Sequence, residues 1–140
     1  DGIIVSVKDP ETALESIIGP FRSMGEAGRK TVVATRWCVL AHDDDEAWRA
    51  LRSMRGLRAP GRLEAVDPMT LRLRADDMPR EEILNKYARA HDAASLIDVY
   101  GPLVRRVGAD YVSIQVASTD PLGTIDLIGR EVLPQLREIG

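Results

Sequence analysis

Apolar residues along the chain alternate between short continuous runs and repeats at helical spacing. The continuous runs cover residues 2–7, 31–41 and 110–117 and are rich in β-branched side chains. Such runs are typical of buried strands. After each run, apolar residues recur every three or four positions, which predicts helices that pack on the outside of a sheet.

The first predicted helix follows the first run directly. Pro10 stands at a first-turn position, where its missing N–H costs nothing. Gly19 and Pro20 lie inside the apolar repeat and predict a kink or a brief break, because proline cannot donate the helical hydrogen bond. Gly25 and Gly28 predict the end of the helix.

The later elements show similar signals. The aspartates of "HDDDEAW" can cap a helix after the second run, and Asp92 can cap another one. Residues 79–86 predict a short helix, and residues 119–139 predict a closing amphipathic helix. Residues 55–78 have no clean period, so we expect an insertion or a covering segment there rather than core.

Strands joined by helical crossovers predict a parallel sheet within one domain of residues 1–140. Three strand–helix units cannot close a barrel, which typically needs about 250 residues. The chain is therefore either a small open α/β sheet or the C-terminal portion of a (β/α)8 barrel. In the barrel case Ile3, Val5, Val39 and Ile114 would face the barrel, and would meet water in this segment alone. We then expect the segment to self-associate.

Composition narrows the class of partner. The 140 residues are 44% apolar and 29% charged, with a net charge of −3 and a pI near 5.4. This balance argues against a general nucleic-acid or anionic-membrane binder, since those polyanions attract basic surfaces. The single cysteine, Cys38, suits a reducing, cytoplasmic setting. The chain begins in a strand without an initiating methionine, as a piece of a longer protein would.

The candidate chemistry starts with Lys8, which ends the first apolar run. A cation at the carboxyl end of a strand lies where α/β barrels bind their ligands. A partly desolvated lysine there would attract a phosphate or a carboxylate. The alternative is a solvated lysine that pairs with Asp9 or Glu11.

Other candidates have structural explanations. His42 precedes three aspartates, but neighbouring side chains diverge, so capping explains the aspartates better than a metal site does. His42 could still line the mouth of a pocket. We expect Cys38 to be a buried small apolar residue, and Trp37 and Trp48 to lie in the core.

Four stretches together resemble the last third of the luciferase-like oxidoreductases. They are "DGIIVSVKDP", "RWCVLAHDDDEAW", "DDMPREEILNKYARAHD" and "GADYVSIQVASTDPLGTIDLIGREVLPQLRE". The likeness is strongest to members that use the deazaflavin coenzyme F420, such as the glucose-6-phosphate dehydrogenases and the methylenetetrahydromethanopterin reductases.

The resemblance implies strands six, seven and eight of a (β/α)8 barrel, with residues 55–78 as the insertion segment. It also implies coenzyme F420, a small-molecule substrate, a missing N-terminal barrel half as partner, and a homodimer. The catalytic residues of the family lie in the absent first five strands. No catalytic residue is therefore expected here, and the segment should be inactive alone.

Three cations match the substrate-phosphate positions of the sugar-phosphate members. They are Lys8 after strand six, Arg62 in the insertion and Lys86 in the following helix. Val5 stands where those enzymes use a threonine on the same phosphate. The resemblance therefore implies an anionic substrate without establishing glucose 6-phosphate.

Two further interpretations remain open. The same barrel could use FMN, as a flavin-dependent monooxygenase, because the residues that decide the coenzyme are absent. The 140 residues could instead form a complete small α/β binding or assembly module without catalysis.

Overall fold

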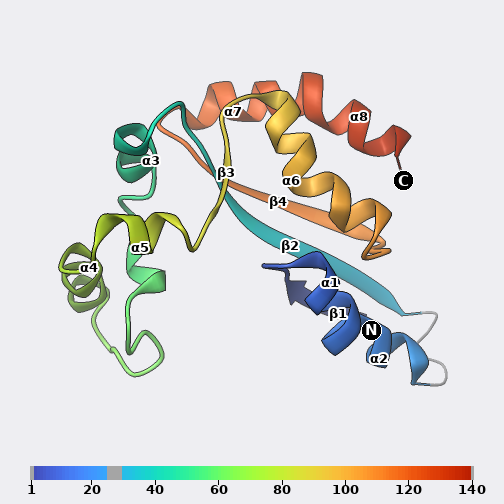
Figure 1. The fold of residues 1–140 in the computed structure, drawn as a ribbon, viewed down its shortest axis with the longest axis horizontal. Helices are drawn as coiled ribbons and strands as arrows, with labels where there is room; N and C mark the ends of the chain where they lie inside the picture. Colours follow the sequence, from blue (N-terminus) through green and yellow to red (C-terminus); the bar gives the residue numbers. More distant parts are fainter. Residues whose placement is uncertain (1, 25–29, 140) are drawn as a thin grey trace.

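The fold comes from a computed structural model, which describes residues 2–24 and 30–139 (Figure 1). Its strands form a four-stranded, fully parallel sheet, and helices follow the strands along the chain. This confirms the predicted parallel α/β class. Gly25 and Gly28, the predicted helix end, lie outside the described residues.

The sheet is organised around one long central strand. β1 (Gly2–Ser6), β3 (Ala88–Ala90) and β4 (Tyr111–Ala117) all pair in parallel with β2 (Thr31–Leu40). β4 pairs with residues 33–39 of β2 and so occupies one of its edges. β1 and β3 therefore share the other edge.

This shared edge is interrupted. β1 pairs with residues 31–35 of β2 and β3 with residues 38–40, which leaves Arg36 and Trp37 between the two paired segments. The chain leaves the sheet at the end of β1, beside this interruption, and Lys8 lies there. The sequence pattern did not reveal β3, because three residues are too few to show a period.

Aspartates cap several of the helices, including the two caps predicted from "HDDDEAW" and from Asp92. Asp9 caps α1 (Pro10–Ala13), Asp43 caps α3 (Asp44–Ala50), Asp92 caps α6 (Ala93–Arg105) and Asp120 caps α7 (Pro121–Leu127). In each case the carboxylate accepts a hydrogen bond from a free backbone N–H of the first turn. Asp92 and Ser95 form a reciprocal capping box.

The expected break at Pro20 takes another form. Helix α1 continues into a π-helical turn, η1 (Leu14–Ile18), and then into α2 (Gly19–Ser23), which contains the proline. The wider turn immediately precedes Pro20 and carries the chain to it without ending the helix. The same arrangement recurs at the C-terminus, where η4 (Ile128–Val132) precedes α8 (Leu133–Glu138) and its proline.

Residues 55–78 contain more regular structure than the sequence pattern indicates. They form a 3-10 turn, η3 (Arg55–Arg58), and a helix, α4 (Pro68–Asp76), before α5 (Arg80–Leu84). Helix α4 has no apolar stripe, which explains why periodicity missed it. Figure 1 shows α3, α4 and α5 gathered beyond one end of the sheet, while α6, α7 and α8 lie along its side.

Two apolar clusters cover different parts of the sheet. The larger cluster joins one face of β1, β2 and β4 to α1 and α6, and includes Val5, Ile18 and Leu96. The smaller cluster covers the carboxyl end of β2, around Val39 and Leu51. The opposite face of the sheet, which we call the open face, carries Ile4, Ser6, Val33, Thr35, Trp37, Tyr111, Ser113 and Gln115.

The open face corrects one expectation. Val5 is buried, and Ile3 and Ile114 are partly buried against the larger cluster, so these three residues lie on the covered face. Val39 has the parity of the open face, but the smaller cluster buries it. Ile4, one position away from Ile3 and Val5, points to the open face and is 77% exposed. Because side chains alternate along a strand, assigning the wrong parity assigns the wrong face.

Candidate functional site

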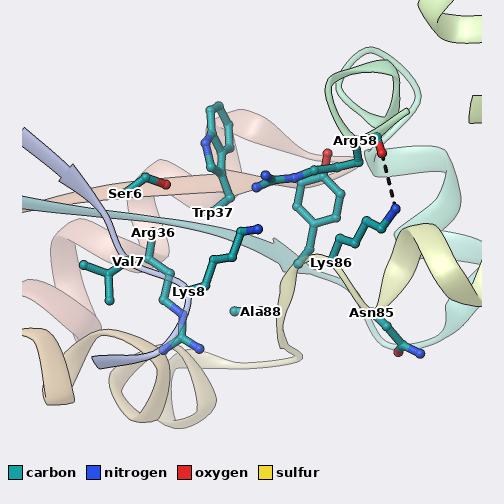
Figure 2. Close-up of a pocket in the computed structure, with 10 residues that line it drawn as sticks. Ser6, Val7, Lys8, Arg36, Trp37, Arg58, Asn85, Lys86 and Ala88 are labelled. Carbon is teal, nitrogen blue, oxygen red and sulfur yellow. Dashed lines mark hydrogen bonds between the residues drawn. The ribbon is translucent and has the colours of Figure 1, made fainter. Parts of the chain in front are cut away.

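Three cavities share lining residues at the interruption beside β2. Their volumes are about 300, 360 and 430 Å³, and Lys8 and Arg58 line all three. Four cations, Lys8, Arg58, Arg62 and Lys86, line the 360 Å³ cavity together, and we call them the cationic site. Figure 2 shows the Lys8 ammonium and the Arg58 guanidinium extending into the same space.

The structure brings together all three cations that the sequence singled out. Lys8 comes from the end of β1, Arg62 from the segment between η3 and α4, and Lys86 from the turn after α5. Arg62 directly follows Gly61, which has a φ of +68°, in the left-handed region that favours glycine. Sequence reasoning missed Arg58, because arginines are so frequent in this region that spacing alone does not separate it from its neighbours.

Lys8 lacks an ion pair in the part of the chain that the structure describes. Both carboxylates proposed as its alternative partners are engaged elsewhere. Asp9 accepts the Thr12 N–H at 2.8 Å, and this hydrogen bond lowers the pKa of Asp9. Glu11 lies 3.1 Å from Arg106. The charge of Lys8 is therefore available to a ligand.

Lys86 and Arg62 are each held by a hydrogen bond to a backbone carbonyl oxygen. The Lys86 ammonium donates to the Arg58 carbonyl oxygen at 3.4 Å and lies 3.2 Å from Glu82, one helical turn away. Arg62 donates to the Leu57 carbonyl oxygen at 3.1 Å. The backbone of η3 thus receives hydrogen bonds from two of the four cations, which keeps them close together.

Acidic groups balance only part of this charge. Glu64 is the carboxylate that lines the 360 Å³ cavity with the four cations, and Glu82 pairs with Lys86 from outside it. Like charges at close range repel each other, and an anion that enters the cavity relieves this repulsion. The arrangement is suited to binding an anionic group.

The adjoining cavity of about 430 Å³ has a different lining. Ser6, Thr12 and Ser16 contribute hydroxyl groups, and Trp37 contributes an aromatic ring. Trp37 was expected in the core but lies on the open face and is only half-buried. A ligand whose anionic group occupies the cationic site could therefore extend its polar body along these hydroxyls.

A separate cavity of about 450 Å³ lies at the carboxyl ends of β2, β3 and β4. His42 and His91 both line it, together with Glu46. Glu46 accepts hydrogen bonds from the His42 backbone N–H and the Thr119 hydroxyl, each at 2.8 Å, and these bonds lower its pKa. Within residues 2–24 and 30–139, no group of three or more histidine, cysteine or acidic residues is arranged to hold a metal ion.

Cys38 follows the expected pattern. Cys38 is fully buried, and burial raises the pKa of its thiol to about 12, which removes it as a nucleophile. No helix within the described ranges has the length and apolar character needed to cross a membrane.

Comparison with solved structures shows that the fold is shared with known proteins. The chain is similar to an F420-dependent secondary alcohol dehydrogenase in complex with an F420–acetone adduct, with a TM-score of 0.75 and 24% sequence identity. The match covers 98% of this chain and 43% of that one. No protein-family model matches the chain, and no curated protein matches it in sequence. The likeness shows the fold.

Proposed function

We propose that this chain is the C-terminal part of an F420-dependent oxidoreductase with a (β/α)8 barrel. The complete enzyme transfers a hydride between the deazaflavin and the carbon of an alcohol, aldehyde or imine-type substrate. This part supplies strands six to eight and the cationic side of the substrate pocket, and it is inactive alone. The substrate carries an anionic group, which Lys8, Arg62 and Lys86 bind.

The observation that supports this proposal most is the structural match over 98% of the chain. That match spans less than half of an alcohol dehydrogenase, as expected for a chain that forms part of a barrel. The cationic site adds an independent argument, since it lies beside the carboxyl end of β1, on the side of α/β folds where substrates bind.

The open face also agrees with the proposal that the rest of a barrel packs against this chain. The Thr35 hydroxyl and the Gln115 side-chain carbonyl are buried there without a hydrogen-bond partner among the described residues. Buried polar atoms normally have partners, so these two oxygens suit a face that meets further polar groups. We assign no residue of this chain to the coenzyme.

The chain's own contribution to the reaction is positioning. When bound, the deazaflavin accepts or donates the hydride. The cationic site holds the anionic end of the substrate, and the hydroxyls of Ser6, Thr12 and Ser16 orient its body. Binding energy from a non-reacting group can in this way fix the reacting carbon at the coenzyme.

The test uses the protein at its natural length. We expect an intact mass more than twice the 15.4 kDa of this chain, and binding of oxidised F420 at micromolar coenzyme in a fluorescence titration. A parallel titration with FMN is expected to show no binding.

Other results would contradict the proposal in distinguishable ways. FMN binding without F420 binding would favour a flavin-dependent monooxygenase on the same barrel. A natural mass near 15.4 kDa with neither coenzyme bound would favour the small α/β module.

A further inference from the structure

Side chains with the parity of the open face form rows across the sheet, because the strands are parallel and in register. Neighbouring strands in such a sheet lie about 4.8 Å apart, so the members of a row are neighbours. Along the strands the rows change from apolar to polar and back to apolar. From the amino to the carboxyl end they are Ile4, Val33 and Tyr111; Ser6, Thr35 and Ser113; Trp37 and Gln115; and Val39 and Ala117.

The two apolar rows have different surroundings. Val39 and Ala117 are buried by the smaller cluster at the carboxyl end of β2. Ile4 and Tyr111, at the other end, are 77% and 66% exposed. The polar rows lie between these two ends. A structure that covers the exposed row therefore closes over the polar rows as well.

Two oxygens of the polar rows are already shielded from water. The Thr35 hydroxyl and the Gln115 side-chain carbonyl are buried without a hydrogen-bond partner among the described residues, and Thr35 as a whole is 9% exposed. Burying a polar group without a hydrogen bond is unfavourable, so buried polar atoms of native folds normally have partners. We therefore look for the missing partners in the structure that covers the open face.

The chemistry of these partners follows from the sheet. Backbone N–H groups of a parallel sheet bond to neighbouring strands, and only side chains project from its faces. The Gln115 oxygen is an acceptor, so it requires a side chain with an N–H or O–H donor. The eight residues of the open face are all uncharged, and a cationic donor buried against them would lack a counter-ion. The donor is therefore a neutral group.

We propose that further strands of the natural-length protein cover the open face and direct a neutral donor, a hydroxyl or an amide, at Gln115 and Thr35. This rests on the proposed function, because those strands belong to the N-terminal part of the barrel, and it deepens it by naming the chemistry of their inward surface. The fold leaves room for them, since the structural match takes 98% of this chain and 43% of the alcohol dehydrogenase. Barrel interiors are dominated by branched apolar side chains, so an uncharged polar layer at mid-height is a property of these residues and not of the fold.

The experiment compares the urea denaturation midpoint of the natural-length protein with those of Thr35→Val and Gln115→Met. Both substitutions remove the oxygen and roughly keep the size of the side chain. We expect both midpoints to shift to lower urea concentration, because a donor inside the barrel loses its acceptor. In the 140-residue chain alone we expect the midpoints to stay or to rise, since the two oxygens have no partner to lose there.

Gln135→Met is the matched control. Gln135 is exposed on α8, away from the open face, so we expect its substitution to shift the midpoints of the natural-length protein and of the chain alone alike.

Gln115→Glu tests whether the donor is neutral. At neutral pH we expect its midpoint in the natural-length protein to be lower than that of Gln115→Met, because the carboxylate is buried without a counter-ion. A midpoint above that of the unchanged protein would show a cationic donor and overturn the assignment.

Two further outcomes would overturn the inference. If the natural-length protein tolerates Thr35→Val and Gln115→Met as well as Gln135→Met, no donor meets the two oxygens. If both substitutions lower the midpoints of the natural-length protein and of the chain alone equally, the partners lie within this chain or in solvent. Failure of F420 binding with the expected midpoints would sink the coenzyme assignment and leave the covered face standing. F420 binding without the expected midpoints would do the reverse.

Discussion

At the scale of single residues, Tyr100 joins the sheet to its covering helix. Its hydroxyl lies 3.0 Å from the Arg36 carbonyl oxygen, and it accepts the Gln115 N–H at 3.2 Å. One side chain of α6 thus satisfies backbone groups of both β2 and β4. Burial raises the pKa of Tyr100, so the hydroxyl keeps its proton at neutral pH.

Removing this hydroxyl should destabilise the fold. In Tyr100→Phe the part-buried Gln115 N–H loses its acceptor, and we expect the free energy of unfolding to fall by about 1 kcal/mol. Urea denaturation followed by circular dichroism measures the change. Tyr111→Phe is the control, because Tyr111 is 66% exposed. Equal stability of the two variants would contradict the role assigned to Tyr100.

At the scale of elements, aspartate caps begin the helices that cover the sheet. Asp92 shows the arrangement most fully, since its carboxylate accepts the Ser95 N–H at 2.8 Å and the Ser95 hydroxyl bonds back to the Asp92 N–H. The Ser95 hydroxyl, which also lies 2.6 Å from the Asp92 carboxylate as a donor, and the Ser95 N–H together lower the pKa of Asp92. A lowered native pKa means that ionised Asp92 stabilises the fold above its unfolded pKa, and that this stabilisation disappears as pH falls through the native pKa.

We therefore expect Asp92→Ala to lower the melting temperature at neutral pH and to lose this difference in strong acid. Thermal unfolding of both proteins across an acidic pH series measures the effect. Asp98→Ala, on the same helix, removes an exposed carboxylate that is not part of the cap. A pH-independent difference would show that the cap does not act through its charge.

At the scale of the whole molecule, the sheet has one covered face and one open face. Ile4 and Tyr111 are 77% and 66% exposed there, and β1 and β3 leave backbone groups at the sheet edge. Exposed apolar side chains beside open strand edges favour pairing with another chain.

The prediction is that this segment self-associates in solution. Light scattering should give a mass that rises with concentration, and the double variant Ile4→Lys with Tyr111→Lys should reduce the association by placing charges on the open face. Leu122→Lys is the control, because Leu122 is 80% exposed on α7, away from that face. A monomeric mass at high concentration would contradict the prediction, because the open face would then remain in contact with water.

Local patterns alone determined the parallel α/β class, the three longer strands and the capped helices. Each of these depends on neighbours within a few residues: β-branched runs for β2 and β4, and aspartates before the first turns of α3 and α6. The match of Lys8, Arg62 and Lys86 came from resemblance, and the structure places these three cations around one cavity.

Tertiary structure decided what depends on contacts between distant residues. The three residues of β3 form a strand only because they pair with the edge of β2. Which face each side chain of β1 takes is decided by the helices, which cover Val5 and leave Ile4 exposed. The sequence does not distinguish Arg58 from Arg55, because both lie in the same arginine-rich stretch after α3. Only the fold pairs Arg55 with Asp76 and leaves Arg58 facing Lys8, because a charge is neutralised by what lies near it in space.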